Sequence, residues 1–215
     1  MKIISRFKNK VIYENENIED IGELLEEAVK KGIDLEDADL SNLDLRNLDL
    51  RCAQLSGADF RNSKLQNIDL RCAIVDHVRF GASDISHSNL SRCDMTHSDF
   101  ENAHLTNVVA MWSKIDGTFF ENVHLANVNL SSSYTNAYSK PWDGFECSFE
   151  NASIENSNFE GACLNFADFG NAQILNCNFK DAELDGTILD CKATRTNLNY
   201  EEEETKWTQC QLWGD

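Results

Sequence analysis

The chain has 215 residues, of which 41% are hydrophobic and one is proline, and its formal net charge is −18. This composition excludes a disordered tail or a collagen-like chain, and no apolar run approaches the roughly 20 residues that a membrane helix needs. So strong an acidity argues against direct nucleic-acid binding, which requires a basic surface, and permits a protein partner with a basic surface.

The cysteines and the first residues bear on the cellular compartment. The eight cysteines form no CxxC pairs, and a chain of this length is long for a disulfide scaffold. The first residues contain no apolar run followed by a cleavage site, so no secretory signal is expected there. Reduced thiols and a cytoplasmic location are therefore predicted.

The N-terminal segment differs in pattern from the rest of the chain. Residues 2–14 alternate and turn around residues 8–10, which predicts a β-hairpin. The next apolar residues fall on one helical face: Ile18, Ile21, Leu25 and Ala28. Asn17 is a candidate N-cap of this helix, with Asp20 three residues later, and Gly32 ends the helix. Residues 1–32 are thus predicted to form a hairpin-plus-helix cap.

A strict five-residue period begins after residue 33. Every fifth residue is apolar with almost no exception, starting with Leu35, Leu40, Leu45, Leu50, Leu55 and Phe60 and continuing to Leu130. Two positions before each lies a small residue, such as Ala38 or Ala58, and the residue between them is often Asp or Asn. A period of five fits neither a helix nor a strand. Each unit must therefore contain a bend, with two side chains pointing inward and three outward.

A second period, four of these units long, predicts four sides for each coil. Two asparagine columns share it: Asn42, Asn62, Asn102 and Asn122, and Asn47, Asn67, Asn107 and Asn127. Asparagine tolerates the left-handed backbone of corners, and stacked amides can hydrogen-bond up a ladder. We predict an all-β solenoid in which residues i and i+20 lie above one another at a coil spacing of about 4.8 Å.

The repeat unit resembles that of a known family. Ala58-Asp59-Phe60-Arg61-Asn62 is a good copy of A(D/N)LXX, so residues 33–198 are similar to pentapeptide-repeat proteins. The resemblance implies a right-handed quadrilateral β-helix with four pentapeptides in each coil. A solenoid of flush faces offers no deep cleft, and no nucleophile stands beside a plausible base, so no enzymatic activity is predicted.

The reading frame breaks after Leu130 and resumes at Phe149, which is not a multiple of five further along the chain. The only proline, Pro141, lies between them and predicts a loop near residues 134–146. Two alternatives remain open, a nine-residue insertion and a one-residue deletion. With the insertion, one core column continues through Phe60, Phe80, Phe100, Phe120, Phe149 and Phe169.

Residues 199–215 drift from the repeat and carry Trp207, Leu212 and Trp213. The last coil of a solenoid exposes unpaired backbone N–H and C=O groups, which another segment must cover. This tail is therefore predicted either to cover the last coil or to pair with another protomer in a homodimer.

The histidines make two pairs at the spacing of one coil, His77 with His97 and His104 with His124. Imidazoles stacked at strand spacing are weak candidates for a shared metal ion. No carboxylate or thiol completes a four-ligand set, so neither a metal nor another cofactor is expected.

Cys52 and Cys72 share the same one-coil spacing, each in the phrase Asp-Leu-Arg-Cys-Ala. An expected Cα separation of about 4.8 Å lies within disulfide range. A reducing compartment favours the free thiols, and the sequence leaves both states open.

Within the family, the sequence is similar to quinolone-resistance (Qnr-like) proteins in its length, acidity and interrupting loop. That resemblance implies a DNA mimic that binds and protects DNA gyrase or topoisomerase IV. The implied contacts on the loop are Tyr134, Tyr138, Lys140, Pro141 and Trp142. The alternative is a generic protein–protein interaction scaffold, since fold does not dictate function. A carbohydrate-modifying or metal enzyme is a distant third.

Overall fold

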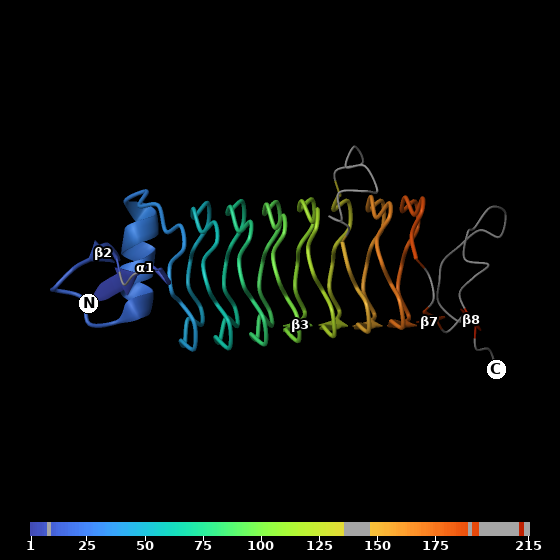
Figure 1. The fold of residues 1–215 in the computed structure, drawn as a ribbon, viewed down its shortest axis with the longest axis horizontal. Helices are drawn as coiled ribbons and strands as arrows, with labels where there is room; N and C mark the ends of the chain where they lie inside the picture. The colour runs from blue at the N-terminus through green and yellow to red at the C-terminus, as the bar shows by residue number, and fades with distance from the viewer. Residues whose placement is uncertain (8–9, 136–146, 189–190, 194–210, 213–215) are drawn as a thin grey trace.

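The middle of the chain winds into a stack of coils in the computed structural model, which describes residues 1–7, 10–135, 147–188, 191–193 and 211–212 (Figure 1). Residues of successive coils form parallel bridges in four ladders. The first bridges of these ladders join Asp39 to Asp59, Asp44 to Lys64, Asp49 to Asp69 and Gln54 to Ile74. Each of these four bridges joins residues i and i+20, as the sequence predicts for a coil of four pentapeptides.

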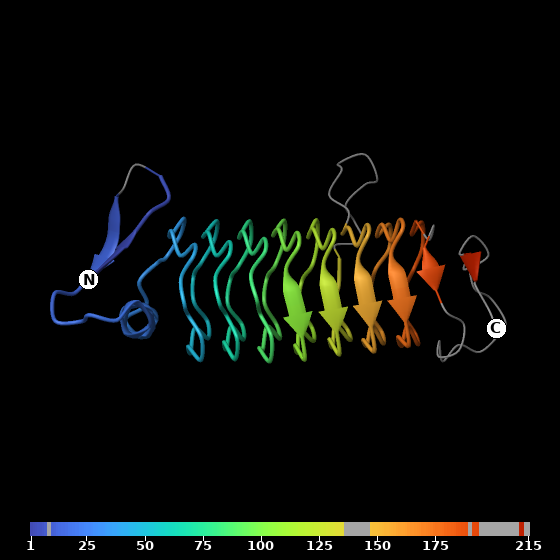
Figure 2. The same cartoon turned by 90° about the horizontal axis from the view of Figure 1, so that it is seen from below.

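One ladder lengthens into strands toward the C-terminal end (Figure 2). These are β3 (His104–Thr106), β4 (His124–Ala126), β5 (Ser153–Glu155), β6 (Gln173–Leu175), β7 (Lys192–Ala193) and β8 (Gln211–Leu212). They pair in that order, and every pairing is parallel. Because β8 pairs with β7 of the same chain, this part of the tail extends the ladder; the rest of residues 199–215 lies outside the described residues.

The large inward side chains form the core. Phe60, Phe80, Phe100, Phe120, Phe149 and Phe169 are each at most 1% exposed. Their successive ring centroids lie 5.3, 4.6, 5.0, 4.9 and 4.7 Å apart, and every pair is stacked. The strict coil period produces this column, because identical rings then lie one above another. Such packing stabilises through buried apolar area and aromatic contact.

The small inward position is often serine, and its hydroxyl is satisfied by the backbone. Ser63 Oγ donates to the Leu40 carbonyl at 2.7 Å, and Ser113 Oγ donates to the Leu90 carbonyl at 2.8 Å. Each bond reaches a carbonyl of the preceding coil. A buried polar group therefore costs little here, because it links neighbouring coils.

The corners have a left-handed backbone. Asn47 and Asn67 have φ of 65° and 60°, and Asn107 and Asn127 have φ of 57° and 54°. Their amides form the predicted ladder: Asn67 Nδ2 donates to Asn47 Oδ1, and Asn127 Nδ2 donates to Asn107 Oδ1, both at 3.1 Å. Asparagine suits these positions because it tolerates positive φ better than most residues.

The N-terminal hairpin consists of β1 (Lys2–Ile4) and β2 (Val11–Glu14), which pair antiparallel with an irregular register at Ile4. It meets the first coil through an antiparallel bridge between Ser5 and Ala38. The Asp39 N–H donates to the Ile4 carbonyl at 2.8 Å. An N–H group at the edge of the stack thus finds an acceptor in the hairpin.

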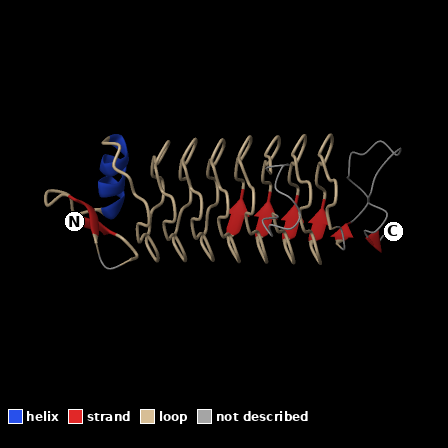
Figure 3. Cartoon of the chain, turned by 45° about the horizontal axis from the view of Figure 1, so that its top comes forward, coloured by secondary structure: helices blue, strands red, loops and turns tan. Residues whose placement is uncertain are grey.

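The helix α1 (Ile21–Lys30) follows the hairpin and lies across the N-terminal end of the stack (Figures 1 and 3). The Asn17 N-cap prediction was wrong, because the Asp20 carboxylate caps the helix by accepting from the Glu23 N–H at 2.8 Å. The Asn17 N–H instead donates to Asn15 Oδ1. Of the described helices, none is long and apolar enough to cross a membrane.

The frame break corresponds to the nine-residue insertion. His124 of β4 pairs with Ser153 of β5, and Phe119 bridges Ser148, so each of these residues i meets residue i+29. That spacing is one full coil plus the insertion. Tyr134 bridges both Lys114 and Cys163. The repeat therefore continues one unit beyond Leu130, and Tyr134 belongs to a coil rather than to the inserted loop.

Candidate functional site

The insertion leaves the stack at one corner, between Thr135 and Cys147. Earlier coils place His77, His97 and Gly117 at the same corner, with φ of 55°, 56° and 58°. The His77 and His97 rings lie 5.0 Å apart and are tilted by 37°. A Cβ atom on Gly117 would clash with the His97 ring at Nδ1. Only glycine therefore leaves room for this imidazole.

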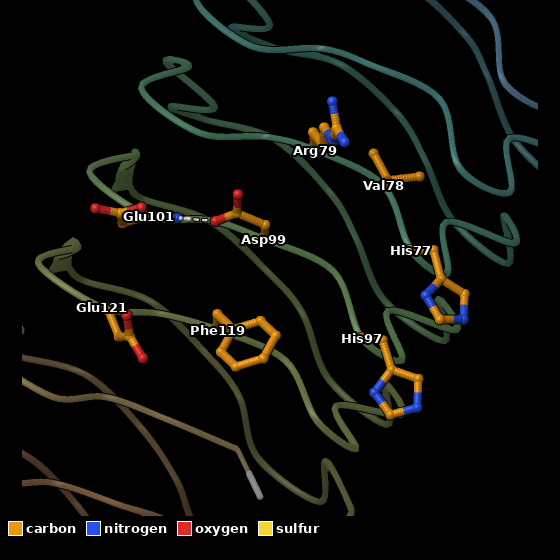
Figure 4. Close-up of a pocket in the computed structure, with 8 residues that line it drawn as sticks. All are labelled: His77, Val78, Arg79, His97, Asp99, Glu101, Phe119 and Glu121. Atoms are coloured by element: carbon orange, nitrogen blue, oxygen red, sulfur yellow. Dashed lines mark hydrogen bonds between the residues drawn. The ribbon is translucent and has the colours of Figure 1, made fainter. Parts of the chain in front are cut away.

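Beside this corner, the surface has a hollow of about 380 Å³ (Figure 4). The hollow combines imidazole, carboxylate and aromatic side chains from three successive coils. It is lined by His77, Val78, Arg79, His97, Asp99, Glu101, Phe119 and Glu121. Phe119 bridges Ser148, which is the first residue of its ladder after the insertion. The hollow and the base of the loop are therefore neighbours.

The hollow belongs to one face of the stack, which we call the Phe-column face. Its outward ladder directly precedes the inward phenylalanines and comprises Asp39, Asp59, Arg79, Asp99, Phe119, Ser148, Asp168 and Ile188. Phe119 is 39% exposed, whereas Phe120, the next residue, is 1% exposed. The pleat of the ladder explains this difference, because adjacent side chains point to opposite sides.

The N-terminal coils neutralise their own carboxylates. In four units an aspartate pairs with the arginine two residues later: Asp44 with Arg46, Asp49 with Arg51, Asp59 with Arg61 and Asp69 with Arg71, each at 2.6 Å. Hydrogen bonds from these arginines lower the pKa values of Asp44 and Asp49. This surface is therefore ionised, with its charge compensated locally.

The later coils lack this compensation. Residues 33–98 carry 11 acidic and 7 basic side chains, for a net charge of −4. Residues 99–188 carry 13 acidic and 3 basic side chains, for a net charge of −10. Within the described part of the chain, Asp99, Glu101 and Glu121 form no ion pair. The hollow therefore lies where uncompensated negative charge begins.

The other histidine pair lies on a different face. His104 and His124 occupy equivalent positions in β3 and β4, and their rings meet edge to face at 6.2 Å. Among the described residues, no group of three or more His, Cys, Asp or Glu side chains is placed to hold a metal ion.

The described cysteines range from exposed to buried. Cys52 and Cys72 are exposed corner residues with free thiols, at φ of 59° and 60°. Burial raises the pKa of Cys93 to about 12 and raises the pKa of Cys147 further. The thiols of Cys93 and Cys147 are therefore protonated and unreactive at neutral pH.

Of the five residues predicted for the loop site, only Tyr134 lies among the described residues. Tyr134 is 47% exposed on its coil. Tyr138, Lys140, Pro141 and Trp142 lie outside the described residues. Sequence reasoning missed Phe119, although the signal was present: an apolar residue stands where the repeat prefers Asp or Asn. The roles of Glu101 and Glu121 became visible only when the two coils were stacked.

Comparisons with known proteins agree with this repeat. A family model described as pentapeptide repeats matches eight copies, at residues 31–71, 76–109 and 152–190. No curated protein matches the sequence.

Three solved structures illustrate the structural likeness. Full-length QnrB1, a plasmid-mediated fluoroquinolone resistance protein, is 13% identical with a TM-score of 0.41, covering 82% of this chain and 93% of that one. HetL, a heterocyst-regulation protein from the cyanobacterium Nostoc, is 20% identical with a TM-score of 0.24, covering 74% and 86%. Rfr23 from the cyanobacterium Cyanothece is 16% identical with a TM-score of 0.20, covering 72% and 90%. Likenesses this weak assign no partner.

Proposed function

Since the chain belongs to the pentapeptide-repeat family, we propose that it is a non-enzymatic, cytoplasmic protein that binds a basic protein surface. The observation that carries this proposal is the uncompensated charge of residues 99–188, with a net charge of −10 beside a loop and a hollow. Carboxylates without cationic partners attract a basic surface over long range, and pairing on contact adds specificity.

The proposal includes the architecture: a right-handed, four-sided β-helix over residues 33–198, a cap on its first coil from residues 1–32, and a C-terminal cap or tail from residues 199–215. The cap is supported by bonds that satisfy edge N–H groups, from Asp39 to the Ile4 carbonyl at 2.8 Å and from Asp49 to Glu26 Oε1 at 2.9 Å. Covering raw edges is what keeps a solenoid soluble.

The partner proposed first is a type II topoisomerase, either DNA gyrase or topoisomerase IV. A rod with regularly spaced carboxylates resembles the phosphate backbone of duplex DNA, which these enzymes bind on a basic surface. The likeness to Qnr-like proteins in length, acidity and interrupting loop supports the same choice.

A supercoiling assay tests this partner. Purified protein is titrated into gyrase reactions with and without a fluoroquinolone, and the assay is repeated with topoisomerase IV. We expect relief of drug inhibition, or direct inhibition of supercoiling, at micromolar protein and low salt. No effect on either enzyme at micromolar protein would end the topoisomerase proposal.

The charge asymmetry favours a second candidate, an interaction scaffold for a different basic partner. A uniform DNA mimic has no need for the Asp–Arg pairs of the N-terminal coils, such as Asp44 with Arg46 at 2.6 Å. One compensated half and one uncompensated half suit a partner that contacts only part of the rod. Cross-linking from single cysteines placed in each half, followed by identification of the partner, distinguishes the candidates. A topoisomerase should cross-link along both halves.

A further inference from the structure

The exposed ring of Phe119 is the least expected feature of the Phe-column face. At the other coils up to Asp168, the same ladder holds a charged or polar residue. Two backbone bonds hold Phe119 in the ladder, since its N–H donates to the Ser98 carbonyl at 2.9 Å and its carbonyl accepts from Phe100 N–H at 2.8 Å. The backbone of Phe119 is therefore fixed in the ladder, and 39% of the residue is exposed.

Three carboxylates line the same hollow as this ring. Glu121 follows on the same coil, and Asp99 and Glu101 occupy the preceding coil (Figure 4). Asp99 Oδ1 accepts from the Glu101 N–H at 2.8 Å, which orients that carboxylate. Glu101 Oε1 accepts from Asn102 Nδ2 at 3.1 Å. Both groups keep further lone pairs available, because an ionised carboxylate accepts about four hydrogen bonds.

The arginine that lines the same hollow, Arg79, pairs with a carboxylate outside it. Arg79 Nη1 lies 3.9 Å from Asp59 Oδ2, in the preceding coil. Asp59 also pairs with Arg61 at 2.6 Å. Arg79 thus belongs to the compensated N-terminal coils, and the side of the hollow formed by Glu101, Phe119 and Glu121 has no internal cation among the described residues.

We propose that this hollow binds an arginine side chain of the partner protein, with its guanidinium over the Phe119 ring and its N–H groups toward Glu101 and Glu121. A planar guanidinium stacks on aromatic faces and pairs with carboxylates in a fork, whereas an ammonium group can lie over a ring but has no planar fork for the carboxylates. The molecule already contains such a contact, because the Arg92 guanidinium lies 5.3 Å from the centroid of the Trp112 ring. A hollow of about 380 Å³ is of a size that holds one long side chain.

We rest this inference on the proposed binding of a basic protein, and it adds the side chain that is recognised. It does not depend on the partner being a topoisomerase. Failure of the supercoiling assay would therefore leave the arginine hollow intact, and failure of the peptide assay below would leave the topoisomerase proposal intact.

The test uses fluorescein-labelled hexa-arginine and hexa-lysine peptides as probes, with the full chain, at about 0.15 M salt. At this ionic strength charges more than about 8 Å away are largely screened, so local contacts dominate the difference between peptides. We expect the wild-type protein to bind the arginine peptide several-fold more tightly than the lysine peptide.

Three variants locate the contact. F119A should weaken arginine-peptide binding about two- to fivefold and change lysine-peptide binding less, since an exposed cation–π contact is of that size. F119W should restore or strengthen binding, because indole is the better cation–π partner. The double variant E101Q/E121Q should weaken arginine binding about two- to tenfold.

The matched control is E155Q/E160Q, which removes the same charge from other faces of the stack. It should change arginine binding by less than about twofold. Equal binding of the two peptides by the wild type would overturn the proposal. So would equal losses from E101Q/E121Q and E155Q/E160Q, or an F119A variant that binds the arginine peptide normally while its thermal unfolding matches that of the wild type.

Discussion

Replacing Phe120 with alanine removes one ring from the middle of the core column. The Phe120 ring lies 5.0 Å from Phe100 and 4.9 Å from Phe149, at interplanar angles of 18° and 7°. A buried Phe-to-Ala change costs about 3–5 kcal/mol through lost transfer energy and the cavity left behind. Two stacked partners add about 0.5–1.5 kcal/mol each beyond buried area. We therefore expect a loss near the top of that range, about 4–5 kcal/mol.

Urea unfolding followed by far-UV circular dichroism measures this loss. The matched control is F119A, because the neighbouring ring is 39% exposed and points outward. A surface change of this kind should alter stability by about 0.5–1 kcal/mol at most. Similar losses for the two variants, or less than about 1 kcal/mol for F120A, would refute the packed column.

The same column tests the register across the insertion. F120L and F149L each keep most of the side-chain volume, so each should cost about 1.5 kcal/mol or somewhat more. Their combination should show a coupling energy of about 0.5–1.5 kcal/mol, because the rings are stacked. F120L with F169L, which lie two coils apart, should be additive. Additivity of both pairs would contradict the nine-residue insertion.

Three further predictions concern the corners, the N-terminal helix and the exposed cysteines. N107V should cost about 1–2 kcal/mol in urea unfolding, because a β-branched residue resists the φ of 57° found there, whereas N107G should cost less. Hydrogen bonds, chiefly from Lys31, lower the pKa of Glu27 from 4.5 to about 2. Glu27 therefore stabilises the fold above pH 4.5 and loses that effect as the pH falls toward 2, so the Tm deficit of E27Q at pH 7 should shrink over this range. Oxidised glutathione should convert Cys52 and Cys72 to a disulfide. Thiol titration should then show the loss of two thiols, and the Tm should rise. The same rise in Tm in the C52S/C72S variant would show that other cysteines cause it.

The sequence predicts the coil well because the repeat is a strong local signal. The coil period places Phe60 over Phe80 without any knowledge of distant contacts, since each coil touches only its neighbours. The break in the reading frame is harder to interpret from the sequence. Counting from Leu130 permits either an insertion or a deletion, and only the bridge from Phe119 to Ser148 distinguishes them.

The helix start was mispredicted for a similar reason. Asn17 and Asp20 are both good capping residues, and Ile18 fits the apolar face of the helix. In the structure Ile18 is 9% exposed although it precedes α1. A residue that is buried just before a helix and a residue within the helix give the same apolar pattern in the sequence. Only the hydrogen bond from the Glu23 N–H to Asp20 therefore identifies the cap.

By itself the sequence determined the repeat, the four ladders, the inward residues and the overall acidity, because these follow from period and composition. The tertiary structure decided which charges are compensated and where the chain presents a hollow. Asp59 meets Arg79, and Phe119 shares a hollow with Glu101, only where one coil lies against the next. Contacts of that kind depend on the directions of side chains on neighbouring coils, and a linear pattern does not contain them.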